Sequence, residues 1–367
     1  MTFLIQETLK YSIPLMIVAL AGVYSERSGI INLALEGIMI IGAFVGVLCA
    51  RMMQEIPFFA TGVDVSNFIA VDIAKVLDVD KVPAVAEAVF FERQLFQVMI
   101  MAIAAAGGAI FSLLLSFASI NLRADQTIGG TALNLLAPAI SLFLIRIIVN
   151  QNTMTFENGG ASVSDWFLYR KTDFGYTNEE SAGFFVDTFL NRTYLATYVC
   201  IILFVVMSII LYKTRFGLRL RSCGENPQAA DSLGINVTKM RYAGVTISGA
   251  LAGMGGFVYA LTTQGCTSNG DVAGFGFLAL AVMIFGNWKP LNIAGASLLF
   301  GLFKCISASY TTLDINGDGK FLLNNIGISS YIYRLLPFLV TLLVLALTSK
   351  NSRAPKAEGI PYDKGKR

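Results

Sequence analysis

Long apolar runs alternate with polar connections along almost the whole chain, and this pattern predicts a helical membrane protein. A hydrocarbon core of about 30 Å requires about 20 mostly apolar residues per helix. Runs near that length lie at about 8–23, 35–53, 97–120, 128–149, 193–212, 241–263, 291–311 and 331–349. A shorter run at 274–286 is bordered by glycines, which indicates a tilted, re-entrant or broken segment. We therefore expect an all-α polytopic membrane protein with about 8–10 transmembrane helices, broken ones included.

The composition strengthens this prediction and excludes several kinds of site. Of the 367 residues, 55% are hydrophobic and only 14% are charged, so a soluble domain of this composition would expose large apolar patches. The first run does not resemble a signal peptide, because Glu7 precedes Lys10 and no small-x-small cleavage site follows. The five cysteines have no paired spacing and histidine is absent, so we expect no disulfide framework, no metal site and no histidine-based catalysis.

The distribution of charge predicts the orientation. Basic residues dominate the loop 213–241 and the tail 350–367, which places both on the cytoplasmic side. The segments 54–96 and 150–192 are more acidic and are expected to be outer loops. Residues 1–349 then form one transmembrane domain. We interpret the basic residues as topology signals and contacts to membrane lipids, and we expect no nucleic acid as a partner.

A polar interruption lies in the stretch YSERSGIINLALEGIMI, residues 24–40. In one straight helix Glu36 would lie about 18 Å along it, near mid-bilayer, where a carboxylate costs about 2.5 to 3.5 kcal/mol. Gly29 permits a bend, Asn32 is able to cap a restarted helix, and Glu36 would then fall in or near its first turn, where the helix dipole favours an anion. We expect an unwound crossing or elbow, which is tolerated only inside protein or along a cavity.

Other polar residues inside the spans are candidates for the transport pathway. Asn134 is notable because an amide has four hydrogen-bonding sites and Pro138 loosens the helix nearby. Interhelical contact and pathway lining remain equally open for it. The candidate pathway residues are Asn32, Glu36, Thr131, Asn134 and Gln264.

The loop 213–241 contains the signals of a short helix. Asn226 is a favoured N-cap, and Pro227 suits the first helical position. Gln228 to Leu233 provide about two turns, and Gly234 supplies a left-handed stop. Because a helix of this length is marginal in water, it must pack on something, either its own membrane domain or a soluble partner.

Three stretches in the same order resemble a known family. GVYSERSGIINLALEGIMIIGAF at 22–44, ADQTIGGTALNLLA at 124–137, and GLRLRSCGENPQAADSLGINVTKMRYAGVTISGALAGMGG at 217–256 resemble permease subunits of ABC importers in the ribose and branched-chain amino-acid permease superfamily. The similarity is greatest to the branch that transports nucleosides or simple sugars, and it runs over most of the chain. The segments 54–96 and 150–192 depart from the family pattern and look like insertions.

The resemblance implies a non-enzymatic subunit that forms the pathway for nucleosides or a related small polar solute in the bacterial cytoplasmic (inner) membrane. It implies a second permease subunit in a heterodimer, a cytoplasmic ABC ATPase and an extracytoplasmic substrate-binding protein or lipoprotein. The chain has no G-x-x-x-x-G-K-[ST] sequence, so we expect it to bind no cofactor and the partner to use ATP. Ala229, Ala230 and Leu233 would be the face packed on the ATPase. The implied coupling residues are Glu225, Asn226, Pro227, Gln228, Ala229, Ala230, Asp231, Leu233 and Gly234.

Two alternatives remain open. An ABC permease of this branch is also similar to importers of riboflavin or simple sugars. From another class, a secondary transporter driven by an ion gradient also uses broken helices near the midplane. Such a carrier has no need of a cytoplasmic docking helix, which favours the ABC permease.

Overall fold

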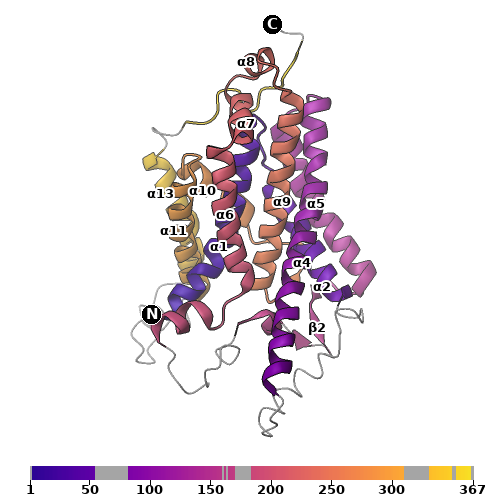
Figure 1. Cartoon of the computed structure of the whole chain (residues 1–367), viewed down its shortest axis with the longest axis vertical. Coiled ribbons are helices and arrows are strands. Elements are labelled where there is room, and N and C mark those ends of the chain that lie inside the picture. Colours follow the sequence, from indigo (N-terminus) through magenta and orange to yellow (C-terminus); the bar gives the residue numbers. More distant parts are fainter. Residues whose placement is uncertain are drawn as a thin grey trace.

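The computed structural model describes residues 2–53, 82–158, 161–162, 164–169, 183–309, 330–348 and 353–364, and it confirms an all-α polytopic membrane protein. Its long helices form an elongated bundle (Figure 1). They are α1 (Thr2–Glu26), α2 (Leu35–Met53), α4 (Val82–Ser116), α5 (Gln126–Val149), α6 (Leu195–Lys213), α9 (Val237–Thr263), α11 (Pro290–Ser309) and α13 (Ser330–Thr348). Among the described residues, seven helices are long and apolar enough to cross a membrane.

Shorter elements connect these helices. The helical ones are α7 (Arg215–Glu225), α8 (Pro227–Ser232), α10 (Phe275–Phe285), the 3-10 helix η2 (Ser164–Phe167) and the π-helices η1 (Phe117–Asn121) and η4 (Val186–Leu190). The strands are β1 (Met154–Thr155), β2 (Glu157–Asn158), β3 (Ala161–Ser162) and β4 (Thr267–Ser268). β1 pairs with β4 and β2 with β3, both antiparallel. The short apolar run is α10, which at 11 residues is shorter than a full crossing.

Helix α9 lies at the centre of the bundle and packs against α1, α2 and α4. Of its apolar stretch 83% is buried, against 22% for α5 at the perimeter. A Cβ atom added to Gly42 of α2 would overlap the carbonyl oxygen of Gly253, and one added to Gly108 of α4 would overlap that of Gly249. Small residues therefore bring three backbones into contact where bulkier side chains would separate the helices.

Helix α4 is longer than the apolar run at 97–120 predicts. It begins at Val82, so residues 82–96 of the segment 54–96 are helical. Its 35 residues span about 52 Å, and its first turns extend beyond the bundle (Figure 1). Hydropathy marks only the part of a helix that matches the membrane, whereas the alanines and glutamates of 82–96 continue the helix outside it. Residues 54–81 lie outside the described part of the chain.

Part of the segment 150–192 packs against α4 at Phe96. The ring of Phe96 lies 5.7 Å from that of Trp166, and the rings of Phe156 and Phe167 are 5.3 Å apart. Phe156 and Phe167 are fully buried. This aromatic cluster joins the described part of the predicted loop to the main hydrophobic core of the bundle.

The segments that the charge distribution predicts on opposite sides of the membrane lie at opposite ends of the bundle. α7, α8 and the chain's C-terminus lie at one end, whereas the N-terminus, β2 and the extended start of α4 lie at the other (Figure 1). Arg27 follows α1 and its guanidinium contacts the Glu225 carboxylate at 3.3 Å. The end of α1 therefore lies beside the loop 213–241, as expected.

Candidate functional site

The predicted interruption is real, because α1 ends at Glu26 and α2 begins only at Leu35. The Glu36 carboxylate accepts hydrogen bonds from the backbone N–H groups of Gly274 (2.9 Å), Gly276 (2.5 Å) and Phe277 (3.3 Å). These are free donors at the start of α10, where the helix dipole favours an anion. Glu36 is 7% exposed, so it joins the starts of two broken helices.

The depth of this junction follows from the length of α10. Its 11 residues span about 16 Å, roughly half of a hydrocarbon core. The residue Trp288, just beyond its other end, donates a 2.5 Å hydrogen bond from its indole N–H to Glu26, the last residue of α1. Because Glu26 lies at the end of the bundle that carries α7, the start of α10 lies about halfway through the bundle.

The Asn134 side chain of α5 forms hydrogen bonds with the backbone around the start of α2. Its Oδ1 accepts from the N–H of Gly37 (2.8 Å), and its Nδ2 donates to the carbonyl of Leu33 (2.7 Å). Both are backbone groups that the break in the helix leaves without a partner in their own helix. The contact between α5 and residues 27–34, called the unwound segment below, is therefore direct.

Asn32 lies within the unwound segment, and its side chain also bonds to a backbone group close to the start of α2. Its Oδ1 accepts from the N–H of Ala34 (3.1 Å), and its Nδ2 donates to the hydroxyl of Ser248 in α9 (3.0 Å). Asn32 and Ser248 are both fully buried. Three of the five candidate pathway residues thus meet at one intramembrane junction.

The other two candidates form no hydrogen bond with Asn32, Glu36 or Asn134. Thr131 is exposed on α5, and its hydroxyl donates to the carbonyl of Thr127 in its own helix (3.0 Å). Gln264 is the C-cap of α9, and its Nε2 donates to the carbonyl of Asp271 (3.3 Å).

Sequence reasoning missed two charged residues near Glu36. Lys304 of α11 and Asp271 both interact electrostatically with Glu36, and the Lys304 ammonium lies 5.2 Å from the ring centre of Phe275. A lysine within an apolar run is itself a signal, because charged side chains in spans usually face protein or a water-filled cavity. The junction therefore combines two acids and one base.

The second candidate site is α8, whose local signals are confirmed. The Asn226 side chain accepts from the N–H of Ala229 (3.0 Å), Pro227 occupies the first turn, and Gly234 has φ +80°. The helix ends at Ser232, and Leu233 is its C-cap. It therefore ends slightly earlier than the predicted span to Leu233.

The faces of α8 differ from the prediction at one position. Ala230 is 2% exposed and packs with Cys223 and Val237 inside the chain, so its expected place on an outward face is wrong. The reason is that α7 and the start of α9 lie beneath α8 and enclose that side chain. Leu233 is 81% exposed, and Gln228 and Ala229 are exposed beside it.

The remaining coupling residues have the following surroundings. Asp231 is partly exposed, Pro227 is buried, and Glu225 is exposed while it contacts Arg27. The outward surface of α8, formed by Gln228, Ala229 and Leu233, is called the α8 face below.

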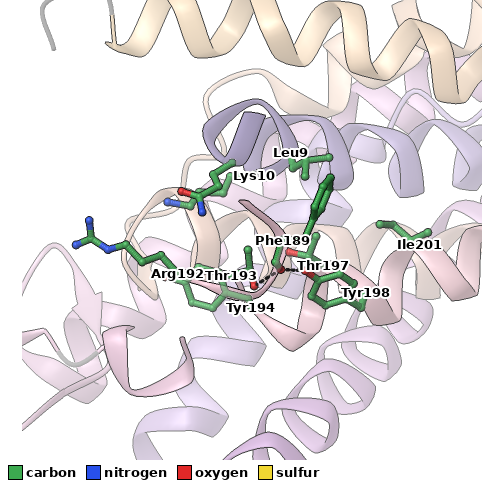
Figure 2. A pocket seen from close by; sticks show the side chains of 10 residues that line it. Leu9, Lys10, Phe189, Arg192, Thr193, Tyr194, Thr197, Tyr198 and Ile201 are labelled. Carbon is green, nitrogen blue, oxygen red and sulfur yellow. Dashed lines mark hydrogen bonds between the residues drawn. The ribbon is translucent and has the colours of Figure 1, made fainter. Parts of the chain in front are cut away.

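A small pocket lies at the opposite end of the bundle, between α1, η4 and α6 (Figure 2). Leu9, Phe189 and Ile201 contribute apolar walls, and the hydroxyls of Thr193 and Tyr198 both donate to the carbonyl of Phe189. None of the candidate pathway or coupling residues lines this pocket. The junction and the α8 face therefore remain the two candidate sites.

Comparison with known proteins adds independent findings. The family model described as "Branched-chain amino acid transport system / permease component" matches residues 4–345. The nucleoside ABC transporter permease protein NupC of Lactococcus lactis is 36% identical over 363 residues, 99% of this chain and 97% of the relative. The guanosine ABC transporter permease protein NupQ of Bacillus subtilis is 35% identical over 368 residues, 100% of this chain and 98% of the relative.

A further relative matches only a part of the chain. The nucleoside ABC transporter permease protein NupB of Lactococcus lactis is 35% identical over 107 residues, which is 29% of each chain. No solved structure matches.

Proposed function

The chain belongs to the family of permease components of the branched-chain amino acid transport system, and on this premise we propose that it forms the pathway of an ABC importer for nucleosides. The substrate class is supported by two relatives of nearly the same length, a nucleoside permease and a guanosine permease. Such an importer would lie in the bacterial cytoplasmic membrane.

The exposed α8 face is the main support for a role in coupling. A capped helix of six residues stands at the end of the bundle with a leucine 81% exposed. An exposed leucine on an ordered helix favours a protein partner, because docking would remove its side chain from water. We assign this face to the ATPase, which would hydrolyse ATP while this chain binds no nucleotide.

The structure supplies a route from the α8 face to the membrane interior. Glu225 directly precedes the N-cap of α8 and contacts Arg27, the first residue of the unwound segment. The other end of this segment is held by the hydrogen bonds of Asn32, Asn134 and Glu36. Movement of α8 by the ATPase would therefore act on the place where α2, α5, α9 and α10 meet. Broken helices are suited to such a change, because the few residues between their two parts are able to absorb changes in backbone angle.

The expected partners complete the importer. NupC and NupB are both named as nucleoside permeases of one organism, which supports a second permease chain beside this one. An extracytoplasmic binding protein would deliver the substrate to the end that carries the N-terminus, opposite α8.

The test is uptake by the assembled complex in proteoliposomes, with the binding protein outside and ATP inside. We expect uptake of labelled guanosine that requires ATP and is competed by other nucleosides. Riboflavin and ribose serve as competitors that distinguish the neighbouring substrate classes. Efficient competition by either, or uptake that an ion gradient drives without ATP, would contradict the proposal.

A further inference from the structure

Residues 353–364, called here the C-terminal strap, cross the end of the bundle that carries α7 and α8. The N–H of Ala357 donates to the carbonyl of Gly224 at the end of α7 (2.8 Å), and the N–H of Gly359 donates to the carbonyl of Gly29 (3.3 Å). The strap thus forms backbone hydrogen bonds with both the coupling segment and the unwound segment.

Three more contacts tie the strap to further elements. Asn287 Oδ1 after α10 accepts from the N–H of Arg353 (3.0 Å), Arg241 of α9 donates to the carbonyl of Ile360 (3.0 Å), and Arg123 before α5 forms two hydrogen bonds with Asp363 (2.9 and 3.2 Å). Contacts of this number and spread are not typical of a polar tail, which usually remains solvated.

The strap also covers the small core beneath α8. Cys223, Ala230 and Val237 form this core, and Tyr362 of the strap packs against it. Burial raises the pKa of the Cys223 thiol, as expected for a side chain shielded from water. The position of α8 therefore depends on a side chain more than a hundred residues away in the sequence.

The fit is tight where the strap meets the unwound segment. Gly29 has φ +95° and Gly359 has φ +75°, conformations that favour glycine. A Cβ atom on Gly359 would lie 2.9 Å from Cδ1 of Ile31, and one on Gly29 would lie 3.4 Å from the carbonyl oxygen of Ala357. A side chain at either position would strain the backbone, and one at Gly359 would also displace the Ile31 side chain.

The other end of the unwound segment also forms hydrogen bonds with neighbouring helices. The N–H of Ile31 donates to Oε1 of Gln126 in α5 (2.7 Å), and Asn32 is bonded to Ser248 of α9. The segment is therefore anchored to the strap at one end and to the intramembrane junction at the other.

We propose that the C-terminal strap is a positioning element for coupling, which holds α7, α8 and the unwound segment together so that movement at the α8 face reaches the intramembrane junction. This inference rests on the proposed function for the meaning of coupling. The physical attachment of the strap to α7 and α8 is testable without it.

The first experiment measures attachment through Cys223, with the other four cysteines replaced. Maleimide labelling of Cys223 should become about tenfold faster in Tyr362→Ala and in Gly359→Val, because the first removes apolar packing against the core and the second strains the strap backbone, and either loss eases local opening. Lys356→Ala is the matched control, since this strap residue is exposed. Equal labelling in all variants would overturn the proposed attachment.

The second experiment measures coupling in the assembled importer. Both strap variants should co-purify with the ATPase and hydrolyse ATP, while the substrate imported per ATP falls about tenfold relative to Lys356→Ala. An unchanged ratio of import to hydrolysis would overturn the positioning role. Failure of the proposed function would look different, because the unmodified complex would then show no ATP-dependent uptake while Cys223 still reported the strap.

Discussion

At the scale of single residues, the buried polar side chains of this protein act as caps for interrupted helices. Unwound backbone inside a membrane leaves N–H and carbonyl groups without partners, and each such group is costly. Glu36, Asn134 and Asn32 satisfy these groups from other parts of the fold. Their polarity is therefore explained by the break itself, before any contact with a substrate is considered.

Asn134→Leu should destabilise the protein by about 1 to 3 kcal/mol, because it leaves the Gly37 N–H and the Leu33 carbonyl without their partner. The measurement is thermal unfolding of purified protein followed by size-exclusion chromatography. Thr131→Val on the same helix is the control and should change stability by less than about 0.5 kcal/mol. Loss of transport in a stable Thr131→Val protein would indicate that Thr131 contacts the pathway.

Glu358 should make attachment of the strap depend on pH. Burial raises the pKa of Glu358 from its ordinary 4.5 to about 7, Arg27 opposes this rise, and the carboxyl of Glu26 lies nearby. Because the attached strap holds the proton more tightly than a released one, attachment weakens as pH rises from about 4.5 to about 7 and then levels off.

The check on Glu358 is Cys223 labelling between pH 5 and 8. Dividing the rate by that of Glu358→Gln removes the ionisation of the thiol itself. The ratio should rise up to about pH 7 and then remain constant. A ratio independent of pH would show that Glu358 does not control attachment.

At the scale of elements, α8 has two faces with different tasks. Ala230 faces a small internal core, whereas Leu233 is exposed to solvent at the end of the bundle. Cap residues define where this helix begins and ends, but only the packing of α7 and α9 beneath it decides which side is free. The helix therefore both packs on its own domain and presents a surface, which reconciles the two interpretations left open by its sequence.

Leu233→Asp should leave stability within about 0.5 kcal/mol of the unmodified protein, because the side chain is almost fully exposed. It should weaken binding of the ATPase by about tenfold or more, as expected for loss of an apolar contact in an interface. The measurements are thermal unfolding and co-purification with the ATPase at graded concentration.

Ala230→Leu provides the contrasting variant on the same helix. Overpacking the small core should destabilise the protein by about 1 to 3 kcal/mol. If Leu233→Asp destabilised the protein while Ala230→Leu affected only ATPase binding, the assignment of the two faces would be reversed.

At the scale of the whole molecule, the bundle is organised around glycine contacts between α2, α4 and α9. These contacts place α9 at the centre and bring Ser248 beside Asn32. The intramembrane junction is therefore a consequence of how closely three helices approach one another. The α8 face and the aromatic cluster around Phe96 lie toward opposite ends of the bundle.

Gly253→Ala should impair assembly of the bundle. An added Cβ would overlap the carbonyl oxygen of Ala104 and the Cα of Gly108, so α9 and α4 would have to separate. We expect a loss of about 1 to 3 kcal/mol, visible as a lower unfolding temperature and as aggregation on size exclusion. Gly295→Ala on α11 is the control, because an added Cβ there meets nothing within 4 Å. Equal stability of the two variants would contradict the central role of the glycine contacts.

Much of the architecture followed from the sequence because its signals act over short distances. Apolar runs predicted the described long helices. The charge distribution predicted which segments lie together at each end of the bundle. Asn226, Pro227 and Gly234 marked the ends of α8. The motifs also indicated the family. Helical hydrogen bonds and caps join residues a few positions apart, so their signals are visible in a short window. The extension of α4 to Val82 was missed because hydropathy responds to lipid contact and not to helix formation.

Only the tertiary structure decided the partners of the interruption, the buried face of α8 and the attachment of the strap. Glu36 binds backbone groups 238 to 241 residues away, Lys304 lies near it from α11, and Ala357 bonds to Gly224. Each pairing depends on which helices meet and at what depth. That arrangement is set by packing between surfaces assembled from distant segments, so no local pattern in the chain specifies it.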